Sequence, residues 1–159
     1  MKARQLAAEF IRIFALDQAA FPAADVNLRA EQETEELPQD AAGADLYRPH
    51  TIVFDVSVTP LDQGGTILRY ALNAMVESKP QDTTGEAHAD LAEKVRRKFF
   101  GTAAADLATA KETMTAAMLS GGKFSLRGYD AGAGDAIDPS VENSLFRTVV
   151  PIRGIALLV

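Results

Sequence analysis

Two long runs of alternating apolar and polar residues constrain the fold of this chain more than any other feature of its sequence. Residues 51–59 carry apolar side chains at every second position, at Ile52, Phe54, Val56 and Val58. Residues 66–77 repeat this pattern from Leu68 to Val76. Alternation with a period of two indicates a strand with one buried face, and the residues between the runs, 62–65, have the composition of a turn. The two runs therefore predict a long antiparallel hairpin.

Three other segments show the spacing of amphipathic helices. The first reaches about Ala20 and places one apolar stripe along the helix, at Leu6, Phe10, Ile13 and Phe14. The second begins at Thr83, which with Glu86 has the spacing of a capping box. The third is the alanine-rich segment 103–119, which the glycines at 121 and 122 are expected to end.

The order of all the elements predicts the fold class. A short extended piece is expected at residues 26–32 and further strands at 123–129 and 144–159, with a loop over 130–140. Helices and hairpins are thus mixed without regular βαβ alternation, which is typical of α+β proteins. We expect an antiparallel sheet of about four to five strands with two to three helices packed on it. A chain of 159 residues fits a single domain, 1–159.

Composition excludes several classes of protein. A net charge of −6 opposes nonspecific attraction to nucleic acid. The absence of cysteine excludes disulfides, thiolate zinc sites and a cysteine nucleophile. The longest apolar run, 148–159, is interrupted by Pro151 and Arg153 and falls short of the roughly 20 residues of a membrane helix. We therefore expect no association with a membrane, and we interpret the N-terminal segment as a mature helix rather than a signal peptide.

The sequence contains little that could support catalysis. His88 lies on the apolar stripe of the second helix and is expected in or near the core, while His50 is expected at the entrance of a strand. Two histidines are too few for a histidine-rich metal site. The glycine-rich segment 131–135 lacks the lysine of a phosphate loop, and no serine lies in a nucleophile elbow. We predict that the chain is not an enzyme, with no catalytic, cofactor-binding or metal-binding residues and no cofactor.

The last strand and an acidic stretch are the candidate interaction sites. Both faces of the strand 144–159 are partly apolar, and Pro151 favours an edge position, so another subunit could complete the sheet. The alternative is that helices of the same domain cover the second face. The predicted subunit interface is formed by Arg147, Arg153, Ile155 and Leu157. The stretch 31–45 contains no lysine or arginine and is expected to be solvated; its main acidic residues are Glu31, Glu33, Glu35, Glu36 and Asp40.

The order and character of these elements resemble the small tail terminator and tail-completion proteins of long-tailed bacteriophages. The resemblance rests on the helix, acidic stretch and hairpin order and on the segments 48–56 (RPHTIVFDV), 124–129 (FSLRGY) and 145–152 (LFRTVVPI). It implies a structural virion protein, made in the host cytoplasm, that forms a ring, typically six-fold. The ring would cap the tail tube, contact neck proteins and join the tail to the head, and DNA would pass through it without specific binding.

The resemblance also implies roles for the candidate residues. The acidic residues Glu31 to Asp40, or the loop 130–138, would face the lumen or the tube. Arg147 and Arg153 would pair across subunits, so charge reversal at Arg153 should weaken the ring without unfolding the subunit. The alternative function is a small-molecule binding domain or a small α+β enzyme, with a pocket between sheet and helices near Tyr70, Tyr129 and His88.

Overall fold

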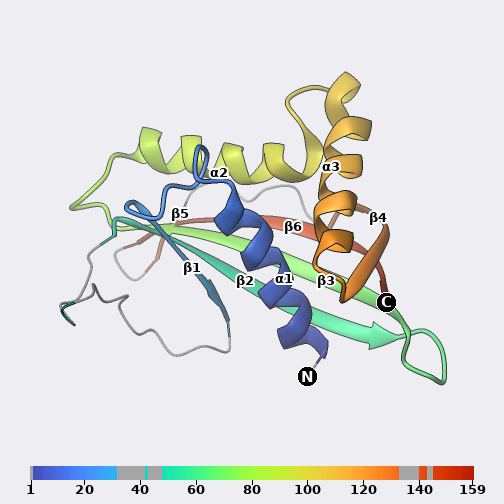
Figure 1. Cartoon of the computed structure of the whole chain (residues 1–159). Coiled ribbons are helices and arrows are strands. Elements are labelled where there is room, and N and C mark those ends of the chain that lie inside the picture. The colour runs from blue at the N-terminus through green and yellow to red at the C-terminus, as the bar shows by residue number, and fades with distance from the viewer. Residues whose placement is uncertain (1, 32–41, 43–47, 133–139, 143–144) are drawn as a thin grey trace.

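The computed structural model describes residues 2–31, 42, 48–132, 140–142 and 145–159 (Figure 1). Over these residues the chain forms helices on one side of a twisted sheet. The elements in order are α1 (Lys2–Leu16), β1 (Val26–Ala30), β2 (His50–Pro60), β3 (Ile67–Ser78), α2 (Gly85–Phe100), a 3-10 turn (Ala104–Asp106), α3 (Leu107–Ser120), β4 (Phe124–Ala131), β5 (Ser140–Glu142) and β6 (Leu145–Leu158).

The sheet has the strand order β1-β2-β3-β6-β4, and β5 pairs with one end of β6. The long hairpin of β2 and β3 is antiparallel, as the alternating runs predict. All other pairs are antiparallel except β1 with β2, which is parallel. The fold is therefore α+β with a mostly antiparallel sheet, and the predicted fold class is confirmed. The parallel pairing of β1 was not predicted, because a short extended piece carries no signal for its direction.

One hydrophobic core lies between the three helices and one face of the sheet. On β3 and β6 the even-numbered side chains point into it, among them Leu68, Leu72, Val76, Val150 and Ile152. An aromatic cluster connects two of the helices, because the ring of Phe99 on α2 lies 5.9 Å from that of Phe10 and 5.6 Å from that of Phe14, both on α1. The amphipathic stripes predicted from the sequence thus cover a single face of the sheet (Figure 1).

Local signals set the ends of the helices, with small shifts from the expected positions. The cap of α2 is Thr84 rather than Thr83, since its hydroxyl accepts a hydrogen bond from the backbone N–H of Ala87 at 3.1 Å. Helix α1 ends at Leu16, earlier than the expected Ala20. After α3, Gly122 adopts a left-handed conformation with φ of 74°, as the paired glycines predict.

The edge position expected for the last strand is wrong. Strand β6 lies inside the sheet, paired along its length with β3 and on its other side with β4 and β5. Pro151 is tolerated there because its carbonyl accepts from Gly132 N–H at 2.8 Å on the β4 side. The N–H and C=O of one strand residue point the same way, so the missing N–H also faces the side where β4 is ending. The ladder with β3 therefore loses no hydrogen bond.

The second face of the sheet is not covered by any helix that the structure describes. We call it the open face; on the two central strands it consists of the odd-numbered residues from Ile67 to Glu77 on β3 and from Arg147 to Leu157 on β6. The alternative that helices of the same domain cover both faces is therefore wrong for the described helices.

Candidate functional site

The four residues predicted as a subunit interface lie together on the open face. Arg147, Arg153, Ile155 and Leu157 are all odd-numbered positions of β6. Arg147 donates to the Glu77 carboxylate of the neighbouring strand at 2.9 Å, so much of its charge is compensated within the chain. Arg153 and Ile155 are exposed, and Leu157 is half-buried beside Ile67. The sequence thus correctly grouped these side chains on one face.

The predicted acidic residues are described only in part. Glu31 follows the end of β1 and is exposed. Glu33, Glu35, Glu36 and Asp40 lie outside the described residues. What these residues share is known from the sequence alone: no lysine or arginine accompanies them in the stretch 31–45.

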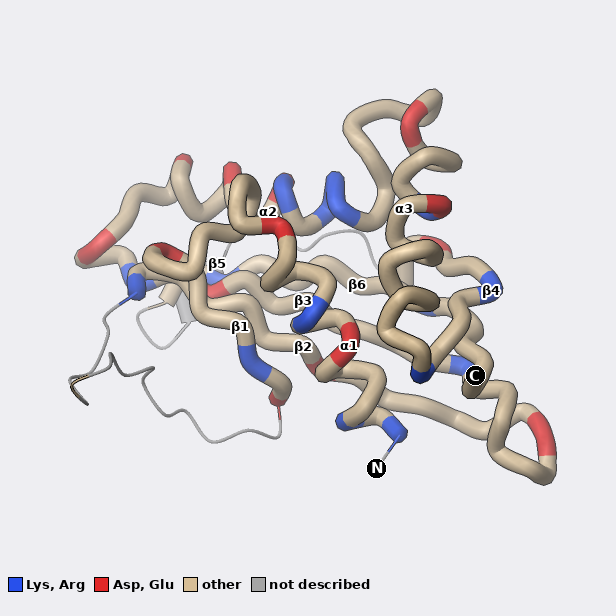
Figure 2. The backbone as a smooth tube through the Cα atoms, viewed as in Figure 1, with Lys and Arg blue, Asp and Glu red and all other residues tan. Residues whose placement is uncertain are grey.

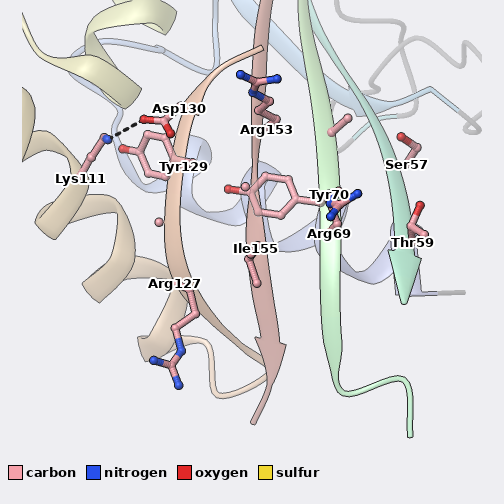
Figure 3. A pocket seen from close by; sticks show the side chains of 13 residues that line it. Ser57, Thr59, Arg69, Tyr70, Lys111, Arg127, Tyr129, Asp130, Arg153 and Ile155 are labelled. Atoms are coloured by element: carbon pink, nitrogen blue, oxygen red, sulfur yellow. Dashed lines mark hydrogen bonds and ion pairs between the residues drawn. The ribbon is translucent and has the colours of Figure 1, made fainter. Parts of the chain in front are cut away.

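A groove of about 710 Å³ crosses the open face where β2, β3, β6 and β4 run side by side, and it extends to Lys111 of α3 (Figure 3). Small residues create the hollow, since Ala71 on β3 and Gly128 on β4 add little or no side chain to the surface. The volume lies in the range of sites that hold a ligand.

Three arginines line this groove. Arg69 comes from β3, Arg153 from β6 and Arg127 from β4, and all three are exposed. Arg127 occupies the irregular position between Leu126 and Gly128, where the pairing of β4 with β6 shifts by one residue. Such a bulge turns a side chain away from the regular alternation of the strand. None of the three guanidinium groups has a hydrogen bond or ion pair with another described residue.

The groove is positively charged although the chain is acidic. The arginines and Lys111 supply four positive charges, and Asp130, which binds Lys111 at 3.1 Å, supplies one negative charge, leaving a formal charge of +3. By contrast, the charges of α2 are balanced, with acidic residues in its first half and basic residues in its second half (Figure 2). There Glu93 pairs with Arg96 at 2.8 Å and with Arg97 at 3.4 Å. We call the site formed by Arg69, Lys111, Arg127 and Arg153 the basic groove.

A buried hydroxyl without a partner lies behind the basic groove, on the core face of the sheet. The side chain of Tyr70 is only 1% exposed, and its oxygen has no hydrogen-bond partner among the described residues. It extends from β3 across β6, where Gly154 leaves the space that it occupies (Figure 3). Burial raises the pKa of Tyr70, so the group stays protonated and can donate. An unpaired buried hydroxyl costs free energy, so this group lowers the stability of the fold.

The second tyrosine of the groove is already satisfied. Tyr129 donates to the backbone carbonyl of Phe99 at 2.5 Å, and Lys111 lies 5.7 Å from the centre of its ring. The groove therefore differs from the predicted pocket: it opens on the open face, whereas the side chains of Tyr70 and Tyr129 lie in the core between sheet and helices. His88, the third residue expected there, is not part of it.

His88 belongs to a buried chain of hydrogen bonds in the core. Its Nδ1 lies 2.7 Å from the hydroxyl of Ser78, which is 2.6 Å from Nδ1 of His50, and its Nε2 lies 2.8 Å from the hydroxyl of Thr148. His88 and Ser78 are fully buried, so no substrate could reach them. The core position expected for His88 and the strand entrance expected for His50 are both confirmed.

These histidines predict a loss of stability in acid. Burial lowers the pKa of His88 and of His50, whereas in the unfolded chain each titrates near 6.5. Below about 6.5 the unfolded state therefore binds more protons than the folded state, and stability falls as the pH falls through that window. We expect a lower melting temperature at pH 5 than at pH 7.5, and a smaller difference in His88→Gln. An equal pH difference in both proteins would contradict this assignment.

Neither the described residues nor comparisons with known proteins assign a metal site, a membrane helix or a family to the chain. Among the described residues, no three histidine, aspartate or glutamate side chains are placed to hold a metal ion. No helix of the described chain is long and apolar enough to cross a membrane. No protein-family model matches the chain, and no curated protein was found to be similar to it.

Proposed function

We propose that the protein is a ring-forming structural subunit of the kind represented by phage tail terminator and tail-completion proteins. In this proposal the ring joins the tail to the head, contacts the tube and neck proteins, and lets DNA pass without specific binding. The observation that carries the proposal is the open face, on which all the residues predicted as an interface come together.

The composition of the open face supports its use in assembly. Its two central strands contain seven apolar residues among twelve, namely Ile67, Ala71, Met75, Val149, Pro151, Ile155 and Leu157, and no lysine. Methionine and arginine are enriched at protein interfaces, whereas lysine is depleted. A solvated sheet face needs none of these apolar residues, so burial against another subunit accounts better for their presence.

Light scattering on the full chain over a wide concentration range tests the proposal. We expect a mass that is a multiple of the 17.0 kDa subunit, with a closed ring as the limiting species. A mass that stays at one subunit at every concentration, also when tail-tube protein is added as a template, would contradict it.

An apolar position outside the basic groove provides a sharper test. Ile67 is 37% exposed at the start of β3, opposite Leu157 of β6 on the open face. We expect Ile67→Lys to raise the concentration needed for half-assembly at least tenfold, because a charge would be buried in the interface, while the melting temperature stays nearly unchanged. Leu119→Lys is the matched control, since Leu119 is 50% exposed on α3, away from the open face. Equal effects of the two variants would exclude the open face as the interface.

A second candidate function is the binding of a small anion in the basic groove. The observation that favours it is the formal charge of +3 of the groove, in which Arg69, Arg127 and Arg153 have no ion pair with another described residue. A ligand that binds the folded chain raises its melting temperature, so inorganic phosphate, citrate and nucleotides can be screened by thermal shift. A shift that disappears in Arg153→Glu would support this function.

A further inference from the structure

We infer that the basic groove binds the acidic run of a second copy of this chain. The acidic run is the segment 31–40, with the carboxylates of Glu31, Glu33, Glu35, Glu36 and Asp40. This inference rests on the proposed ring-forming function and names the contact that joins one subunit to the next.

Charge complementarity is the first argument. The acidic run carries five carboxylates and no cation, and the basic groove carries a formal charge of +3. Arg69, Arg127 and Arg153 have no ion pair within the described chain, so no bond to a described residue must be broken before they bind. A guanidinium group binds a carboxylate through two parallel hydrogen bonds, which makes arginine the preferred partner for such a segment.

The position of Glu31 in the sheet forms the second argument. Glu31, the first residue of the acidic run, follows the end of β1 at one edge of the sheet, whereas the basic groove lies toward β4, the opposite edge (Figure 1). The start of the run and the groove of one subunit thus lie on different parts of its surface. A contact between different surfaces of identical subunits is head to tail, and it generates a ring when its rotation closes.

This inference gives the acidic run a different role from the lumen-facing one that the sequence predicts. A lumen-facing run would affect the passage of DNA and leave assembly unchanged when its charge is reversed. A run that binds the basic groove of the next subunit would control assembly. The two roles therefore differ in one measurable property, the mass of the particle.

Reciprocal charge reversal in the full chain tests the inference. One variant reverses the groove (Arg127→Glu with Arg153→Glu) and the other reverses the run (Glu33→Lys with Glu35→Lys and Glu36→Lys). We expect each variant alone to need at least tenfold higher concentration for half-assembly by light scattering. An equimolar mixture should recover assembly, because each variant then offers the other a complementary pair. Arg4→Glu with Lys123→Glu, two exposed cations outside the basic groove, controls for net charge.

Peptide binding separates this inference from the proposed function. A fluorescent peptide with the sequence of residues 30–42 should bind the wild-type protein in low salt, and at least tenfold more weakly the groove-reversed variant. If the wild-type chain is always a single subunit but binds the peptide in this way, the ring proposal fails and the groove assignment stands.

Three results would overturn the inference. The first is a run-reversed variant that assembles like the wild type while Ile67→Lys does not, which would keep the ring and remove the run from it. The second combines two observations: the mixture of the two variants does not recover assembly, whereas a single chain that carries all five reversals assembles. This result would place the run in the groove of its own chain. The third is a peptide that does not bind while a small anion does.

Discussion

Replacing Phe99 by alanine is expected to lower the free energy of unfolding by about 3–5 kcal/mol, a large part of the stability of a domain of this size. The side chain is fully buried, and its ring lies within 6 Å of three others, those of Phe10, Phe14 and Tyr129. Its removal leaves a cavity between α1, α2 and β4 that these rings can fill only in part. Urea denaturation followed by circular dichroism measures the loss.

The neighbouring residue provides a control for Phe99→Ala. Phe100 follows in the same helix but is only partly buried, at the edge of the core. Phe100→Ala removes the same atoms and changes helix propensity in the same way, so it should cost clearly less. Equal losses in the two variants would mean that the aromatic cluster is not the centre of the core.

Gly154→Ala is expected to destabilise the protein by about 3 kcal/mol, at the upper end of the usual cost of overpacking. A Cβ at this position would lie 2.4 Å from the backbone oxygen of Gly128 and 2.7 Å from the hydroxyl of Tyr70. The Gly128 oxygen belongs to the paired strand β4, so it cannot move away without disturbing the sheet. The variant therefore damages the sheet and the floor of the basic groove together.

Gly64→Ala is the matched substitution for Gly154→Ala. A Cβ at Gly64 would make only ordinary contacts, at 3.5 Å from Asp62 and 3.8 Å from Thr66. We expect its stability to stay within about 0.5 kcal/mol of the wild type, as at most surface positions. If Gly154→Ala were equally harmless in urea denaturation, the close packing of Tyr70 over Gly154 would be wrong.

The parts of the fold that the sequence predicted are those that depend on local periodicity. The alternation of β2 and β3 and the stripe of Phe10 and Phe14 are repeated over many residues, so each identifies its element without knowledge of the rest. The position of β6 depends on pairing with strands far away in the sequence. The rule that proline prefers an edge strand failed at Pro151. A proline disturbs only the side of the strand toward which its missing N–H would point, and at Pro151 this is the side of β4, not of β3.

The candidate site was only partly visible in the sequence. Arg147, Arg153, Ile155 and Leu157 share a face through simple alternation, so their grouping was predicted. The basic groove also needs Arg69 and Arg127, which approach Arg153 only through the register of three strands and the bulge in β4. A usable signal was present: Arg69 and Arg153 each interrupt an apolar strand on its outward side. Their convergence could not be deduced without the strand order.

The place of β6 inside the sheet has a consequence for how the chain folds during synthesis. Strands β3 and β4 are made before β6 but meet each other only through it. Until residues 145–158 have left the ribosome, both strands expose unpaired backbone groups, which are prone to pair with other chains. The joining of β4 to the rest of the sheet must therefore wait for β6, and pairings this distant in sequence form slowly. A nascent chain stalled before residue 145 should need a chaperone to stay unaggregated.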